Sequence, residues 1–210
     1  ATIGLLVPNS VNPYFAELAR GIEDGCERNG YCVILCNSDD DPRKQRSYLR
    51  VLLEKRIDGL IVASVGEEAD LLDSLASVRT PMVIVDRALA GVDADLVRID
   101  HEQGAYLATR HLLELGHQDI ACINGPAHTS VAKMRLAGFH RALAQAGMSQ
   151  YVYPALTTVG QSIRELGEMA SELLLRRIGE PQRSGVEQRI VAPSIVLRES
   201  TGPRPELFND

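Results

Sequence analysis

The segment Asn12–Phe15 (Asn-Pro-Tyr-Phe) carries the side chains best suited to hold a small polar ligand. It follows the apolar run Ile3–Val7 after a short polar loop, and it opens a long amphipathic stretch. This layout places two aromatic rings and an amide at the carboxyl end of a first β-strand, where open α/β sheets bind ligands. Aromatic faces cover the C–H face of a sugar, and an amide bonds its hydroxyl groups. We therefore interpret Asn12, Tyr14 and Phe15 as part of a binding site.

Two further groups can join this site. Asp86 and Arg87 end the fourth predicted strand at the same edge of the sheet, where a carboxylate can accept from two hydroxyls and a guanidinium can donate to two oxygens. Arg135 lies near the start of a later predicted helix, after the polar loop 124–130. Polar groups that converge with aromatic rings at strand ends form small-molecule pockets. Each residue type also has a structural interpretation, as a helix cap, a core ring or a solvated charge.

The patterns of several enzyme classes are absent from the sequence. The turn 8–13 has no glycine, so the Gly-x-Gly approach to a pyrophosphate is missing, and we interpret the acidic run Asp39–Asp41 as a solvated loop and helix cap. There is no Gly-x-Ser-x-Gly elbow, and no two histidines have metal-ligand spacing on one helix face. The sequence predicts a binding protein with no catalytic residue, cofactor or metal.

The composition sets broad limits. A chain of 210 residues, 45% of them hydrophobic, can form one large domain or two small lobes. A net charge of −6 argues against direct binding of nucleic acid by this segment. No apolar run approaches a membrane span, and no export signal is visible. Four cysteines without framework spacing are typical of small buried side chains and suit a reducing cytoplasm, so we expect a cytoplasmic protein without a membrane partner.

The first hundred residues alternate between strand and helix patterns. Short, nearly continuous apolar runs are typical of strands buried on both faces, and they occur at 3–7, 31–36, 59–63, 82–86 and 96–99. Helical apolar spacing occurs between these runs. This alternation predicts right-handed βαβ crossovers and a parallel sheet.

The second region is less regular. It contains a helix pattern ended by Gly116, a strand candidate at Ile120–Ile123, and a helix pattern ended by Gly147. A long helix pattern follows over 161–178, and late strand candidates occur near Ile190 and at 195–197. The strand count predicts a second lobe that is either very small or incomplete.

Several stretches together resemble the effector-binding domain of LacI/GalR-type transcription regulators, which share their fold with periplasmic sugar-binding proteins. The matching stretches are Asn12–Phe15, Lys55–Ile61, Val85–Arg87, Leu115–His117, Ile123–Pro126, Arg135–Phe139, Pro154–Val159 and Val196–Thr201. The resemblance implies the type I periplasmic-binding-protein fold, an α/β fold with two Rossmann-like lobes and a ligand in the cleft between them. It places the first lobe at 1–99 plus 161–178, the second at 100–148 plus 185–201, and a tail at 202–210.

The pattern is most similar to the ribose-binding members of the family. It assigns ligand contacts to Asn12, Tyr14, Phe15, Asp86, Arg87, Arg135 and Gln161. A pentose such as ribose is therefore the expected effector, although related regulators bind hexoses or purines. Effector binding is expected to shift the angle between the lobes and, through a homodimer, to control operator DNA.

The sequence departs from the family in two places. The amino-terminal helix-turn-helix and hinge helix are not in this chain, so we expect it not to recognise operator DNA alone. A segment that completes the second lobe normally lies between the equivalents of Met148 and Ser149. Either the sequence is joined across an unresolved or removed segment, or the second lobe is half built and binds weakly. The alternative functions are a periplasmic sugar-binding protein of an ABC transporter and a sugar-processing enzyme.

Overall fold

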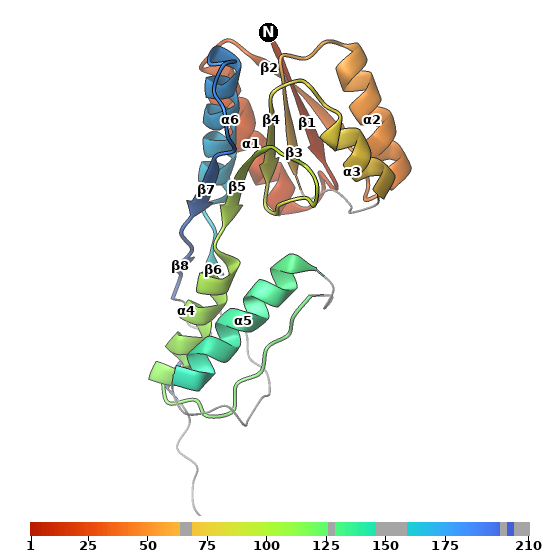
Figure 1. Ribbon diagram of the computed structural model, residues 1–210. Helices are drawn as coiled ribbons and strands as arrows, with labels where there is room; N and C mark the ends of the chain where they lie inside the picture. Colours follow the sequence, from red (N-terminus) through yellow and green to blue (C-terminus); the bar gives the residue numbers. More distant parts are fainter. Residues whose placement is uncertain (64–68, 126–128, 146–158, 198–200, 204–210) are drawn as a thin grey trace, which may run out of the picture. The chain divides into compact units, whose positions relative to one another are not determined.

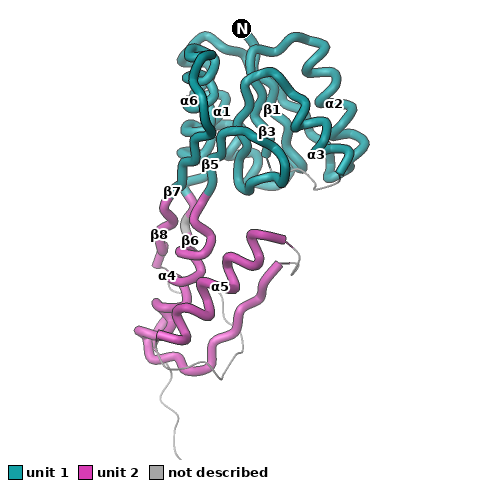
Figure 2. Tube along the Cα trace, in the orientation of Figure 1, with its two compact units in different colours: residues 1–98, 162–191 teal, residues 99–161, 192–210 magenta. Residues whose placement is uncertain are grey.

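The structure is a computed structural model that describes residues 1–63, 69–125, 129–145, 159–197 and 201–203. The chain forms two compact units, coloured separately in Figure 2. Unit 1 comprises 1–98 and 162–191, and unit 2 comprises 99–161 and 192–210. The Met148–Ser149 junction, where the sequence suggests a missing segment, lies outside the described residues.

Unit 1 contains a six-stranded sheet with the order β2-β1-β3-β4-β5-β7. Its strands are β1 (Thr2–Val7), β2 (Cys32–Asn37), β3 (Gly59–Ala63), β4 (Met82–Val85), β5 (Asp95–Ile99) and β7 (Gln188–Val191). The ladders from β2 to β5 are all parallel, with Leu5 opposite both Leu35 and Ile61. The predicted parallel α/β sheet is therefore confirmed. The carboxyl ends of β1 and β4 lie at one edge of it.

Four helices cover the two faces of this sheet (Figure 1). They are α1 (Pro13–Glu27), α2 (Pro42–Glu54), α3 (Ala69–Ala76) and α6 (Ile163–Gly179). The first two begin in the same way, with an Asn12 or Asp41 cap followed by proline in the first turn. Helices α1 and α6 pack closely on one face, where a Cβ at Gly167 would lie 2.4 Å from the Leu18 carbonyl oxygen.

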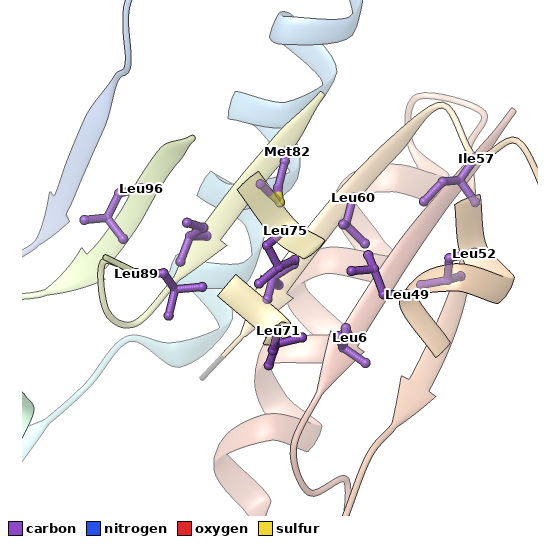
Figure 3. Close-up of a cluster of buried hydrophobic side chains, with 12 residues drawn as sticks. Leu6, Leu49, Leu52, Ile57, Leu60, Leu71, Leu75, Met82, Leu89 and Leu96 are labelled. Carbon is purple, nitrogen blue, oxygen red and sulfur yellow. The ribbon is translucent and has the colours of Figure 1, made fainter. Parts of the chain in front are cut away.

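The opposite face of the sheet packs on α2 and α3 through one apolar cluster (Figure 3). Leu6 of β1 and Leu60 of β3 meet Leu52 of α2 and Leu75 of α3, and all four are at most 1% exposed. Each such side chain contributes about 1.5–3 kcal/mol when fully buried. The cluster fixes the strands, and so it fixes the strand ends from which the candidate ligand groups project.

Strand β2 differs from the prediction that the strands are buried on both faces. It lies at the edge of the sheet, and Ile34 and Leu35, on its two faces, are 38% and 41% exposed. Cys32 is exposed as well, so the expectation of buried cysteines is wrong for that residue, while Cys26 is buried as expected. An apolar run alone does not distinguish an edge strand from a central one.

The return of the chain to unit 1 extends further than predicted. The sequence prediction places residues 185–191 in the second lobe, but they pack in unit 1. Strand β7 follows β5 in the sheet order, and the Leu96 amide donates to the Glu187 carbonyl oxygen at 2.9 Å. This segment therefore belongs to the first sheet up to Val191.

Unit 2 is built around two helices, α4 (His101–Glu114) and α5 (Ser130–Gln145). They approach closely, because a Cβ at Gly138 would lie 2.0 Å from the Glu102 carbonyl oxygen. The Arg141 guanidinium joins them by donating to Glu102 at 2.6 Å, and it lies 4.3 Å from the ring centroid of Tyr106. A short antiparallel ladder joins β6 (Val159–Gly160) to β8 (Ser194–Ile195).

The predicted strand at Ile120–Ile123 is wrong. Within it the structure has a single bridge residue, Ala121, and Ile123 is 80% exposed. Among the described residues of unit 2, β6 and β8 are the only strands. An apolar run becomes a strand when a neighbouring strand completes its ladder, and here the described residues do not supply a parallel sheet. The second lobe is partial in this respect, as the sequence predicted.

Candidate ligand-binding site

The loop between β1 and α1 positions Asn12 as the cap of α1. Its Oδ1 accepts from the Tyr14 amide at 3.0 Å, and its carbonyl oxygen accepts from the Phe15 amide at 3.0 Å. Asn12 therefore has the structural role that its residue type allows. Its Nδ2 amide and its exposed position leave it suitable for bonding a ligand hydroxyl as well.

Two aromatic rings follow this cap at the amino end of α1. The rings of Tyr14 and Phe15 meet edge to face, with centroids 5.0 Å apart and an interplanar angle of 87°. Both residues are half-buried. The Tyr14 hydroxyl donates to Oδ1 of Asp86 at 3.3 Å. The structure thus brings together three groups from two segments that the sequence analysis assigned to one site.

The end of β4 holds Asp86 in an unusual backbone conformation. Its φ is 83°, which is the left-handed region that side chains disfavour. The Asp86 amide donates to the Val97 carbonyl oxygen at 2.9 Å and fixes this turn against β5. Arg87 follows directly and is half-buried. Strain of this kind concentrates at functional sites, which is consistent with a role of Asp86 in binding.

Asn37 is a positioning residue that the sequence analysis did not single out. It ends β2, and its Oδ1 accepts from the Ser10 amide at 3.1 Å. Its Nδ2 donates to Asp39 at 2.7 Å, and Lys44 in turn bonds Asp39. This arrangement lowers the pKa of Asp39, chiefly through the Lys44 bond. The signal in the sequence was a polar residue directly after the second apolar run.

Unit 2 contains a cavity of about 330 Å³. Its wall is formed largely by the apolar sides of α4 and α5, including Ala108, Leu112 and Phe139, and by the segment that begins at Ile120. These helix sides lack a described sheet to pack against, which accounts for the apolar wall. Its polar lining residues are Asp100, His101, Thr109, Asn124, Arg135 and Gln161.

Arg135 and Gln161, the two predicted ligand residues of the second lobe, both line this cavity. Arg135 lies on α5 and is exposed, whereas Gln161 precedes α6 and is half-buried. Burial raises the pKa of the Cys122 thiol, and the positive charge of Arg135 opposes that rise.

The other four polar residues of the cavity, Asp100, His101, Thr109 and Asn124, were not predicted as site residues, and two of them have clear structural roles. Asp100 caps α4, with its Oδ1 accepting from the Gln103 amide at 2.9 Å. Asn124 donates from Nδ2 to the Ala132 carbonyl oxygen at 2.7 Å, which fixes the segment after Ile120 to α5. The predicted ligand residues thus form two sets, five residues in unit 1 and two in unit 2.

The described residues contain no cluster of three or more His, Cys, Asp or Glu side chains that could hold a metal ion. In the same part of the chain, no helix has both the length and the apolar character needed to cross a membrane. The geometry of the two sets is that of groups that bind: hydrogen-bond donors, acceptors and aromatic faces.

Comparison with known proteins agrees with this chemistry. A family described as periplasmic binding proteins and sugar binding domain of LacI family matches residues 1–189. The HTH-type transcriptional repressor PurR of Photobacterium profundum is 45% identical over 149 residues, which are 70% of this chain and 45% of that protein. The chain thus matches less than half the length of this relative, which is named as a repressor and not as an enzyme.

Solved structures match almost the whole chain. A LacI family transcriptional regulator from Enterococcus faecium, with bound ribose, is 26% identical with a TM-score of 0.82, covering 98% of this chain and 100% of that one. A periplasmic binding protein/LacI transcriptional regulator from Alkaliphilus metalliredigens QYMF, complexed with D-xylulofuranose, is 26% identical with a TM-score of 0.78, covering 95% and 98%. Since the family match spans most of the sequence, this chain belongs to the family of periplasmic binding proteins and LacI-type sugar-binding domains.

Proposed function

We propose that this chain is the effector-sensing domain of a LacI-type transcriptional repressor and that its effector is a small sugar, a pentose similar to ribose. The observation that carries the proposal is the Tyr14–Asp86 contact, which sets an aromatic ring beside a carboxylate at the end of two parallel strands. The similar structure from Enterococcus faecium, which contains ribose, supports the same ligand class.

The ligand is proposed to lie between the two lobes. In unit 1, Asp86 accepts from sugar hydroxyls, Asn12 and Arg87 donate, and the rings of Tyr14 and Phe15 cover a C–H face. In unit 2, Arg135 and Gln161 bond the opposite side of the sugar. Because unit 2 is partial in its described part, we expect this chain to bind more weakly than a domain with a complete second sheet.

Signalling is proposed to follow from differential affinity. A sugar that binds one arrangement of the lobes better shifts the population toward it, and coupling of this kind is typically about 1–3 kcal/mol. The response reaches operator DNA through a helix-turn-helix that is not in this sequence. We further propose a cytoplasmic homodimer, which the exposed apolar edge strand β2 supports.

A periplasmic sugar-binding protein is the second candidate, because the matching family includes such proteins. The repressor is favoured by the 45% identity to a protein named as a transcriptional repressor. The reading frame upstream of Ala1 distinguishes them. A helix-turn-helix there supports the repressor, and a cleavable signal peptide supports the transport protein.

Calorimetry with D-ribose tests the proposed function. Arg135→Ala removes a charged donor to the sugar and is expected to abolish most of the affinity of the wild-type chain. Arg110→Ala, which removes an exposed arginine of α4 paired with Glu114, is the matched control and should bind as the wild type does. Equal affinity of Arg135→Ala and wild type would remove Arg135 from the site.

A further inference from the structure

An ion pair between a buried carboxylate and a half-buried guanidinium joins the carboxyl-terminal part of α6 to the start of β5. Asp95 is 2% exposed, and it accepts from the Arg177 guanidinium in a two-bond fork, with Nε to Oδ2 at 2.9 Å and Nη2 to Oδ1 at 2.5 Å. The pairing raises the pKa of Arg177. Such forked pairs fix orientation as well as distance.

The same two side chains also hold the segment that leads into β7. Arg177 donates to the carbonyl oxygens of Arg183 and Gly185, both at 2.8 Å. Oδ1 of Asp95 accepts from the Glu187 amide at 2.7 Å. Three backbone groups of the segment 183–187 therefore bond one ion pair. We name this arrangement of Asp95, Arg177 and their bonds to 183–187 the clasp.

The carboxylate of Glu187 reinforces the clasp from the surface. It accepts from Arg176 at 2.7 Å and from Arg189 at 2.9 Å, and it also pairs with Arg183. The backbone contributes the bond from the Leu96 amide to the Glu187 carbonyl oxygen at this end of β7. Side-chain bonds thus add to the backbone pairing of β5 with β7 at the start of β7.

The clasp joins the two strands from which the chain leaves unit 1. The chain leaves unit 1 after Arg98, at the end of β5, and again after Val191, at the end of β7. We infer that the clasp is a conformational device that holds the starts of β5 and β7 together, and so holds in place the two strands whose far ends are these exits. Its role in signalling rests on the proposed function, since these exits are two of the three places where the chain crosses between the units, the third being Gln161–Ser162. The clasp itself is a property of unit 1 and does not depend on a ligand.

Amide hydrogen exchange on the ligand-free chain tests the inference. The double variant Asp95→Leu/Arg177→Met replaces the pair by apolar side chains, which avoids leaving one buried charge without its partner. Exchange at Glu187 and across Gln188–Val191 is expected to accelerate at least about tenfold, because the bonds to 183–187 are lost. Exchange in β1 should remain at the wild-type rate.

The single variant Asp95→Asn gives a second reading, since its amide oxygen can still accept from Glu187 while the charge pair is broken. We expect an intermediate acceleration at β7. Glu54→Gln, which breaks the exposed Arg50–Glu54 pair of the same unit, is the control and should leave β7 unchanged. Unchanged exchange at β7 in the double variant, or equal acceleration in β1 and β7, would overturn the clasp. Neither result bears on whether the wild-type chain binds D-ribose, so the two proposals fail independently.

Discussion

The Tyr14 hydroxyl donates a hydrogen bond to Oδ1 of Asp86 at 3.3 Å, although 72 residues separate them in the sequence. This bond joins the start of α1, which follows β1, to the end of β4, and β3 lies between these two strands in the parallel sheet. The ring and the carboxylate are therefore arranged before a ligand arrives. Such preorganisation reduces the entropy that binding must overcome.

Tyr14→Phe isolates the contribution of that hydroxyl. It keeps the ring against Phe15 but removes the bond that orients Asp86, and we expect the affinity for D-ribose to fall about fivefold, or about 1 kcal/mol. Calorimetry measures the change, and circular dichroism checks the fold. Tyr31→Phe, on the loop before β2, serves as the control. A Tyr14→Phe affinity equal to that of wild type would show that the bond does not organise the site.

The left-handed backbone of Asp86 predicts that glycine is more stable than alanine at this position, which is the reverse of their order in a helix. At φ 83°, Asp86→Gly should be more stable than Asp86→Ala by about 1 kcal/mol, because glycine alone adopts this region without a steric cost. At Asp73, on the exposed side of α3, the order should be reversed, since alanine favours a helix by about 1 kcal/mol over glycine. Urea unfolding of the four variants gives both differences. The same order at both positions would contradict the backbone assignment. Neither Asp86 variant should bind D-ribose.

Lowering the pH should reduce the stability of unit 1, because Glu187 becomes protonated. Hydrogen bonds from Arg189 and Arg176 lower the pKa of Glu187 from its ordinary value of 4.5. A carboxyl whose folded pKa is depressed contributes stability above the unfolded pKa, and the contribution disappears as the pH falls through the folded value. The free energy of unfolding of Glu187→Gln should therefore lie below that of wild type at pH 7 and converge with it below about pH 4. If the free energies of unfolding of the two proteins differed by the same amount at every pH in this range, Glu187 would not be the source of the predicted pH dependence.

The cysteines should differ in reactivity according to their burial. Burial raises the pKa of Cys26 to about 11, so its thiol should resist alkylation at pH 8, whereas Cys32 is exposed and should react first. Mass spectrometry of the native chain after a short iodoacetamide pulse locates the label. Cys32→Ser should remove the fastest phase, and labelling of Cys26 before Cys32 would contradict the burial pattern.

Much of unit 1 could be predicted from the sequence, because its elements are decided locally. The caps Asn12 and Asp41, each followed by proline, mark helix starts, and the apolar runs mark the strands. The grouping of Tyr14, Phe15 and Asp86 followed from the rule that parallel strands end at one edge. The left-handed φ of Asp86 could not be predicted, because aspartate adopts extended and left-handed backbone alike and only the folded turn beside β5 shows which one occurs here.

The structure of unit 2 could be predicted less well from local sequence patterns. Ile120–Ile123 has the composition of a strand, but strand formation requires a neighbour, and the pattern of one segment contains no information about its neighbour. The placement of 185–191 was missed for a related reason. Asp95, which pairs with Arg177 and accepts from the Glu187 amide, is 92 residues from Glu187 in the sequence, and only the folded chain brings them together.

The most direct test of the sugar-sensing role is a titration of the ¹⁵N-labelled chain with D-ribose, followed by amide chemical shifts, since this measurement detects weak binding and locates it. Hypoxanthine serves as the purine probe. The account predicts saturable shifts with ribose at Asn12–Phe15, at Asp86 and Arg87, and near Arg135 and Gln161, with none of comparable size from hypoxanthine. No shifts with ribose at saturating concentration, shifts confined to other surfaces, or a stronger response to hypoxanthine would contradict it.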